Sequence, residues 1–394
     1  MGTYYRPTKA EISLNALQNN IEGFRARLNN GTKIMASVKA NAYGHGAIEI
    51  AKAAVRFGVD YLGVAFLDEA LQLRNAGIQT PILVLGYVAP EHMELASENQ
   101  VTISFFTEEQ IVAASRLKAS LEQPLKVHVK LDTGMGRLGL TTFEAAVSFI
   151  ERALNIPQLQ VEGVFTHYSK ADEEDKQYTE MQYLRFHRVE EYIRKQGWNI
   201  PLIHAANSAA GIDTPQWSGD MVRLGIAMYG LYPDEVDKKH VKLQPVMSLS
   251  TSIVHIKQVE KEWGISYGAR YTAKAGEWIG TLPIGYADGF SRMLSGKAEV
   301  LIRGKRVPVI GSICMDQCMV SLEAFKDEVI SMEELLHEKV VIIGKQGEES
   351  ITADEIANKL GTIHYEFICM IANRVPREYV ENNKKIALSN HLIK

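Results

Sequence analysis

The segment around Lys39 places a potential nucleophile at a turn. Residues 32–38 form an apolar run typical of a buried strand, and a helical pattern begins at Ala47. Lys39, Gly44 and Gly46 lie between these two elements. A lysine at a strand end can enter a cleft and lose water, which lowers its pKa and makes it a nucleophile or a base. The alternative is an ordinary solvated lysine at a strand end, and the residues around Lys39 distinguish the two interpretations.

Apolar segments alternate with helical patterns over the first part of the chain. Repeated strand–helix units imply parallel strands with right-handed crossovers. Eight such units within about 250 residues match the size of a TIM-type (β/α)8 barrel. A doubly wound open sheet is the alternative. The predicted strands are residues 34–38, 61–66, 81–85, 101–105, 125–131, 159–165, 201–205 and 221–226.

Polar residues follow the ends of several predicted strands, where active sites lie in such barrels. Each has an ordinary explanation when taken alone, such as a core histidine, a surface ion pair or a helix cap. Their gathering at one rim favours a functional site. They are Lys39 after the first strand, Lys130, Asp132 and Arg137 after the fifth, His167 and Tyr168 after the sixth, Asn207 and Ser208 after the seventh, and Arg223, Gly225 and Ile226 along and beyond the eighth.

The pattern changes near Val241, and the last part of the chain is predicted to be mainly β. Strands are expected within 246–259 and at 278–283, 298–303, 307–313 and 340–344, with a hairpin turn at 303–306. A capping box at Thr352 begins one helix, which Gly361 ends. We therefore predict two domains, residues 1–243 and 244–394.

Composition excludes several classes of protein. The net charge of the 394-residue chain is −4, without a dominant basic patch, so nucleic acid is not an expected partner. Cys314, Cys318 and Cys369 form neither a disulfide framework nor a zinc spacing, and we expect no metal. The start of the sequence lacks the apolar core of a signal peptide, and no apolar run is long enough to span a membrane. A reducing cytoplasm is expected.

The nine residues Val38-Lys39-Ala40-Asn41-Ala42-Tyr43-Gly44-His45-Gly46 resemble the pyridoxal-phosphate attachment segment of the alanine racemases. The resemblance implies that Lys39 forms the Schiff base with this cofactor and that Tyr43 holds its phosphate. It extends over almost the whole chain, because the segments after strands five to eight also match.

The resemblance assigns roles to the remaining candidates. In the barrel, Arg137 contacts the phenolic oxygen of the cofactor and the substrate carboxylate, and Lys130 matches a lysine that is often carbamylated. His167 packs on the pyridine ring, and Arg223 faces its nitrogen. Phosphate contacts fall to Asn207, Ser208 and the amides of Gly225 and Ile226. In the second domain, Tyr267 is the second base, the Met315 amide binds the substrate carboxylate, and Tyr365 touches phosphate.

Two positions depart from the family pattern. Lys9 replaces a common tryptophan, and Ser312 stands where many relatives have arginine, which affects the expected substrate corridor.

The implied reaction interconverts L-alanine and D-alanine by two-base proton transfer on a pyridoxal-phosphate aldimine. Lys39 serves one face, and Tyr267 serves the other. A tyrosine base needs a lowered pKa, for which His167 and Arg223 are the candidate cations. Arginine cannot accept a proton, so Arg223 would leave the ring nitrogen unprotonated.

The resemblance also implies a homodimer in which Tyr267 and Met315 act in the partner's site. The product would serve peptidoglycan, or the enzyme would consume D-alanine in catabolism. The alternatives are a pyridoxal-phosphate-dependent decarboxylase of the same barrel-plus-β plan and a non-catalytic protein that binds this cofactor.

Overall fold

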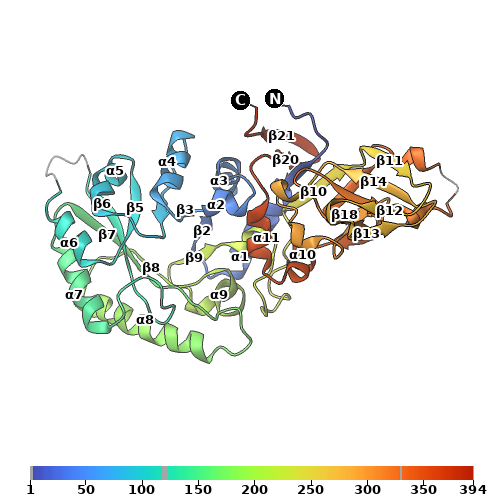
Figure 1. Ribbon diagram of the computed structural model, residues 1–394. Coiled ribbons are helices and arrows are strands. Elements are labelled where there is room, and N and C mark those ends of the chain that lie inside the picture. Colours follow the sequence, from blue (N-terminus) through green and yellow to red (C-terminus); the bar gives the residue numbers. More distant parts are fainter. Residues whose placement is uncertain (1–2, 118–122, 329–330, 394) are drawn as a thin grey trace. The chain divides into compact units, whose positions relative to one another are not determined.

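The computed structural model describes residues 3–117, 123–328 and 331–393, which form two compact units (Figure 1). One unit, here the barrel unit, contains Ala16–Ala42 and Ala47–Gln244. The other, the β unit, contains the segment up to Asn15, Tyr43–Gly46, and the chain from Pro245 onward. The division into domains 1–243 and 244–394 stays a prediction.

The barrel unit contains the predicted eight parallel strands in a nearly closed barrel. Neighbouring strands follow the order of the sequence from β2 to β8, and β9 pairs with β2. At the closing edge, the Arg223 amide donates to the Ala206 carbonyl at 3.1 Å. The TIM-type prediction is confirmed, and the open sheet is wrong because the strand order never reverses. The strands are β2 (Lys33–Ser37), β3 (Tyr61–Val64), β4 (Ile82–Val84), β5 (Val101–Phe105), β6 (Leu125–Lys130), β7 (Leu159–Phe165), β8 (Leu202–His204) and β9 (Met221–Leu224).

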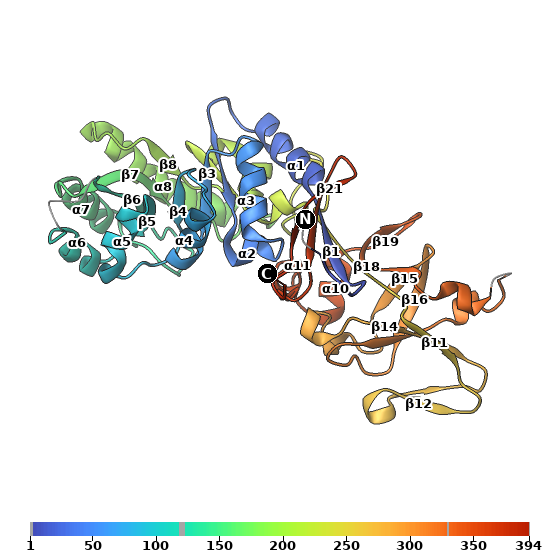
Figure 2. The same ribbon diagram turned by 90° about the horizontal axis from the view of Figure 1, so that it is seen from above.

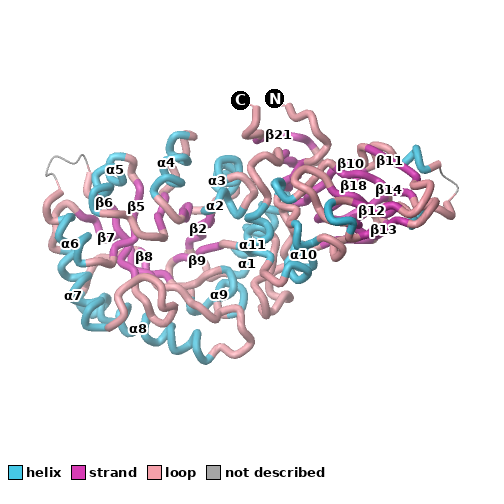
Figure 3. Tube along the Cα trace, in the orientation of Figure 1, coloured by secondary structure: helices cyan, strands magenta, loops and turns pink. Residues whose placement is uncertain are grey.

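Helices lie around these strands (Figure 3). Each buries one face; in α7 (Phe143–Leu154), for example, Phe149 and Ile150 are buried, and Thr142 caps the start by accepting from the Ala145 amide at 3.2 Å. The helix after β5 is α6 (Glu108–Ala114). The others are α1 (Leu14–Arg27), α2 (Lys39–Tyr43), α3 (Ala47–Arg56), α4 (Leu67–Asn75), α5 (Met93–Glu98), α8 (Gln177–Gln196) and α9 (Ser208–Asp213).

The barrel interior is partly apolar and partly polar. Met35, Tyr61, Leu83, Leu202 and Met221 form one buried cluster contributed by five different strands. Histidine and glutamate side chains from β6, β7 and β8 are also buried there.

The β unit is mainly β, as predicted. Its large sheet runs β11-β14-β17-β16-β15-β18-β10-β1-β20-β21, and β19 pairs with β18. The strands are β1 (Lys9–Ser13), β10 (Met247–Ser252), β11 (His255–Gln258), β12 (Trp263–Ile265), β13 (Tyr271–Ala273), β14 (Trp278–Leu282), β15 (Glu299–Ile302), β16 (Lys305–Ile310), β17 (Cys318–Ser321), β18 (Lys339–Gln346), β19 (Glu349–Ile351), β20 (Arg377–Glu381) and β21 (Lys384–Ser389).

Local signals in the β unit worked as expected. Arg303 and Gly304 connect β15 to β16 with φ of 49° and 77°, the positive pair that a tight hairpin requires. Thr352 caps α10 (Ala353–Leu360), and Gly361 ends it with φ of 76°. The helix α11 (His364–Met370) was not predicted.

A separate hairpin, β12–β13, stands away from the large sheet of this unit (Figure 2). The short turn η4 (Tyr267–Ala269) lies between its two strands and carries Tyr267. No helix among the described residues is long and apolar enough to cross a membrane.

Candidate active site

Lys39 begins a single turn of left-handed helix. Ala40, Asn41, Ala42 and Tyr43 have φ between 51° and 53°. The Ala42 amide donates to the Val38 carbonyl at 2.8 Å, which closes the turn. Each non-glycine residue in this conformation costs roughly 1–2 kcal/mol, and consecutive ones are rare. Strain of this kind persists only where the surroundings impose it, and it gathers at functional sites.

Two side chains of the barrel unit impose this conformation. The Glu69 carboxylate accepts from the Ala40 amide at 2.6 Å and from the Ala65 amide at 2.7 Å, so it joins the ends of β2 and β3. The Asn41 carboxamide accepts from the Ala47 amide at 2.8 Å and caps α3. Sequence reasoning missed Glu69, although its place in the first turn of α4, three residues after the cap Phe66, is a known capping position.

The glycines of the same segment are required by close packing in the β unit. A Cβ on Gly44 would clash with the Ile368 carbonyl, and one on Gly46 would clash with the Tyr379 hydroxyl. The Arg377 guanidinium donates to the Gly44 carbonyl at 3.1 Å. The Gly-His-Gly part of the signature is therefore a structural requirement of the loop after Tyr43.

Lys130 is a buried lysine among cations. Only 5% of it is exposed, and its ammonium donates to the Leu85 carbonyl at 2.9 Å. Burial lowers the pKa of Lys130, the charges of Arg137, Arg223 and Lys39 add to this effect, and together they bring the pKa to about 8. Arg137, Arg223 and Lys39 are therefore close enough to this amine to repel its charge, and the shared site at the barrel rim stays a prediction.

The Asp132 carboxylate shapes the loop that carries Arg137. It accepts from the amides of Gly134 and Gly136 at 3.0 Å each and from that of Arg137 at 2.8 Å. Burial alone would raise the pKa of Asp132, but these backbone donors outweigh burial and lower it. The carboxylate thus stays ionised and holds the loop; the Arg137 residue itself is exposed.

Arg223 is a buried cation held on several sides. Its Nη2 donates to the carbonyls of Thr166 and Ala205 at 2.7 Å and to Nδ1 of His167 at 3.0 Å. Its Nη1 donates to Nδ1 of His204 at 2.9 Å. Among the hydrogen bonds of the described residues, none uses Nε of Arg223.

His167 is neutral, so its predicted role as a cation is wrong. A guanidinium can only donate, so Nδ1 of His167 accepts and its proton lies on Nε2. Burial lowers the pKa of His167 well below its usual value, and the charges of Arg223, Arg137, Lys130 and Lys39 add to this effect. The sequence could not indicate that so many cations surround this ring.

The predicted phosphate contacts meet where two short helices begin. Asn207 caps α9, accepting from the Ala210 amide at 3.0 Å. Ser208 begins this helix and accepts from the Gly225 amide at 2.9 Å. Gly225 in turn precedes η3 (Ile226–Tyr229). Amide groups at helix starts point outward and bind anions, so this pair of turns is suited to a phosphate.

Four predicted residues belong to the β unit. Tyr267 is 72% exposed, and its carbonyl accepts from the Ser312 hydroxyl at 2.9 Å. Met315 is 51% exposed, and its carbonyl accepts from the Ala287 amide at 3.0 Å. Tyr365 lies on α11 with its ring stacked on His364 at 4.8 Å. Tyr43 also belongs to this unit.

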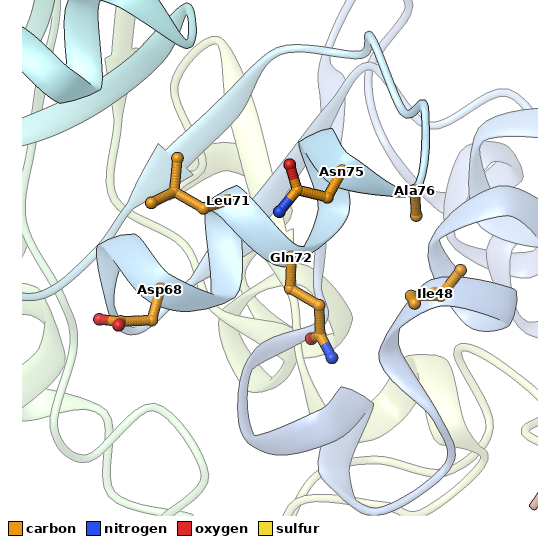
Figure 4. Close-up of a pocket in the computed structure, with 6 residues that line it drawn as sticks. All are labelled: Ile48, Asp68, Leu71, Gln72, Asn75 and Ala76. Carbon is orange, nitrogen blue, oxygen red and sulfur yellow. The ribbon is translucent and has the colours of Figure 1, made fainter. Parts of the chain in front are cut away.

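A hollow on the outside of the barrel is not part of this constellation. It is lined by one residue of α3 and by residues of α4 and just after it (Figure 4): Ile48, Asp68, Leu71, Gln72, Asn75 and Ala76. None of the predicted site residues lines this hollow. Among the described residues, no group of histidine, cysteine and carboxylate side chains is arranged to hold a metal ion.

The fold and the residues after its strands define the class, a (β/α)8 barrel with Lys39 just beyond the end of β2. Family models described as the alanine racemase N-terminal and C-terminal domains match residues 12–233 and 246–379. The chain therefore belongs to the alanine racemase family, and it is an isomerase of that family. The resemblance found in the sequence is confirmed.

Individual relatives agree with this assignment. The alanine racemase of Methanococcus maripaludis is 45% identical over 375 residues, covering 95% of this chain and 99% of the relative. That of Halalkalibacterium halodurans is 43% identical and covers 100% of both chains. The crystal structure of alanine racemase from Bacillus anthracis with bound L-Ala-P superposes with a TM-score of 0.91 at 42% identity, covering 99% of both chains.

Proposed function

We propose that this enzyme interconverts L-alanine and D-alanine with pyridoxal 5'-phosphate, as a homodimer in the cytoplasm. D-alanine would be supplied for peptidoglycan or used in catabolism. The observation that carries the proposal is Lys39 on its strained turn, next to Lys130, Arg137 and Arg223, in a chain of this family. The free thiols of Cys314, Cys318 and Cys369 support a reducing compartment.

The residues present fit this cofactor. No hydrogen bond among the described residues uses Nε of Arg223, so this donor remains for a ring nitrogen. Ser208 and Gly225, near the starts of α9 and η3, would hold the phosphate; in this structure the Gly225 amide donates to the Ser208 hydroxyl at 2.9 Å. The residues that would hold the cofactor are Lys39, Tyr43, Arg137, His167, Asn207, Ser208, Arg223, Gly225, Ile226 and Tyr365.

Each group then has a distinct task. Bound pyridoxal phosphate withdraws electrons from the substrate α-carbon and acidifies its proton. The Lys39 amine and the Tyr267 hydroxyl each take or return that proton, on opposite faces. Because Arg223 donates and cannot release its proton, it leaves the ring nitrogen unprotonated. His167, which is neutral, lies beside Arg223 and would pack on the ring.

The substrate carboxylate would be bound by Arg137 and the Met315 amide. Lys130 is a candidate for carbamylation, because a lowered pKa of about 8 leaves a neutral fraction of the amine free to react. The amine would add to carbon dioxide and release one proton, giving a carbamate. Its negative charge would offset the surrounding cations and hold Arg137 in place.

The other candidate functions are not favoured. Family models match both parts of the chain, whereas a carrier of the cofactor would need only the barrel.

The test is chiral analysis after incubation with L-alanine. We expect D-alanine and no carbon dioxide from the wild type, and no product from Lys39→Ala. The control Lys52→Ala removes an exposed lysine of α3 and should remain active. The Lys39→Ala chain should also fail to retain cofactor after borohydride treatment. Absence of D-alanine with the wild type, or full activity of Lys39→Ala, would refute the proposal.

A further inference from the structure

Arg223 is buried without a carboxylate in contact. It is 5% exposed, and among the described residues no ion pair includes its guanidinium. A buried charge is costly unless it is compensated. Its Nη1, however, begins a line of hydrogen bonds that leads to a carboxylate elsewhere in the barrel.

That line passes through two histidines. Nη1 of Arg223 donates to Nδ1 of His204 at 2.9 Å, and Nε2 of His204 lies 3.0 Å from Nδ1 of His128. Nε2 of His128 lies 3.3 Å from one Glu162 oxygen. Lys126 donates to the other oxygen at 2.9 Å. His128 and His204 are fully buried, and Glu162 is 6% exposed.

The two ends of the line fix the direction of every bond. A guanidinium can only donate, so Nδ1 of His204 must accept and its proton lies on Nε2. That proton points to Nδ1 of His128, whose own proton must then lie on Nε2 and point to Glu162. An ionised carboxylate can only accept, so it imposes the same order. A second proton on either ring would place two donors face to face.

The packing inside the barrel leaves room for the His128 ring and holds the His204 ring. The pairing of β6 with β7 shifts register between Val127 and His128, and a Cβ on Gly163 would lie 2.7 Å from the His128 ring. A side chain at Gly163 would therefore displace that ring. The Phe165 ring stacks on His204 at 5.1 Å with an interplanar angle of 4°.

We infer that Glu162 is the remote counterion of Arg223, and that His204 and His128 are positioning residues that connect the two. This inference rests on the proposed function, because it assigns Arg223 to the cofactor ring. The line holds the guanidinium charged, donating and fixed in orientation. The burial that lowers the pKa of both histidines favours the neutral rings that it requires.

The first test is nitrogen NMR on the holoenzyme labelled at histidine, assigned with His128→Gln and His204→Gln. We expect both rings to be neutral with the proton on Nε2 at pH 7. A proton on Nδ1 of either ring, or a cationic ring, would overturn the inference. This measurement does not depend on turnover, so an enzyme that fails to racemise alanine refutes the proposed function but not the line.

The second test uses Glu162→Gln, which keeps the shape and removes the charge. The bond from His128 weakens, and polarisation along the line should also move the His204 Nε2 proton signal. In Glu162→Gln we expect kcat to fall about tenfold and the cofactor absorbance to shift. Glu162→Asp should recover part of the lost kcat. Glu108→Gln removes an exposed acid as the control. An unmoved His204 signal, or wild-type kcat and absorbance in Glu162→Gln, would overturn the inference.

Discussion

Ser312 is a small residue with a defined partner. It is 1% exposed, and its hydroxyl donates to the Tyr267 carbonyl at 2.9 Å, while its own carbonyl accepts from the Ser266 hydroxyl at 2.6 Å. Ser266 has φ of 66°, so the backbone before Tyr267 is strained. This residue, noticed as a departure from the family pattern, therefore fixes the backbone of the proposed second base.

We predict that Ser312→Ala lowers kcat about fivefold, because a buried hydrogen bond contributes about 1 kcal/mol and its loss frees the Tyr267 turn. The KM for alanine should change less, since the hydroxyl does not bind substrate. Kinetics of alanine racemisation measure this effect. The exposed Ser350→Ala is the control. Unchanged kcat in Ser312→Ala would show that Tyr267 does not depend on this bond.

The left-handed turn after β2 is an element that lowers the stability of the fold and positions Lys39. The exposed Ala40 has φ of 51°, a conformation that glycine adopts at little cost. The amide of Ala40 bonds Glu69, and glycine would keep that amide.

Ala40→Gly should therefore stabilise the protein by about 1 kcal/mol while lowering kcat, because a more flexible turn holds Lys39 less firmly. Denaturant unfolding and kinetics check the two effects. Ala145→Gly, at an exposed position in α7, should instead cost about 1 kcal/mol and leave kcat unchanged. Destabilisation by both substitutions would mean that the turn is not strained.

Near the register shift between β6 and β7, Glu162 makes contacts that are sensitive to acid. Burial alone would raise the pKa of Glu162, but the hydrogen bond from His128 and the hydrogen bond and charge of Lys126 outweigh it, and the pKa falls from 4.5 to about 2. Because the folded pKa is the lower one, the stabilisation is present above pH 4.5 and is lost as the pH falls toward 2.

Glu162→Gln should thus be less stable than the wild type at pH 6, by on the order of 2 kcal/mol, and the gap should narrow at pH 3. Unfolding curves at both pH values measure this gap. The exposed variant Glu108→Gln should differ little from the wild type at either pH. If the stability difference between the wild type and Glu162→Gln did not change with pH, the partners of Glu162 would not stabilise its ionised form.

At the scale of the whole molecule, the two proposed bases come from different units. Lys39 belongs to the barrel unit, and Tyr267 belongs to the β unit. Tyr267 is 72% exposed, as a residue that completes a partner's site would be in a single chain. A two-fold dimer would give two equivalent sites.

Refolding Lys39→Ala together with Tyr267→Ala tests this arrangement. If sites are shared, each mixed dimer has one site with both bases and one with neither. Random pairing makes about half of the dimers mixed, so roughly a quarter of wild-type activity should return. Each variant refolded alone is the control, and subunit exchange is shown by mass labelling. No recovery despite exchange would place both bases in the same subunit's site.

The barrel and the mainly β character of the second part could be predicted from the sequence alone, as could the polar residues that follow the strand ends. These follow from local rules: apolar periodicity marks strands and helices, and parallel strands bring their ends to one rim. Caps such as Thr352 and the Arg303–Gly304 turn also depend on nearby residues alone. Even the missed β1 shows an alternating burial pattern that its sequence could have revealed.

The contacts and protonation states of the candidate site could not be predicted from the sequence, because they depend on the folded chain. Glu162 and His204 are distant in sequence from the residues that they bond, so no local pattern marks them. The capping position of Glu69 is local, but its bond to the Ala40 amide joins residues 29 positions apart. The neutrality of His167 depends on the cations gathered around a buried ring. Protonation is set by desolvation and by neighbouring charges, which exist only once the chain has folded.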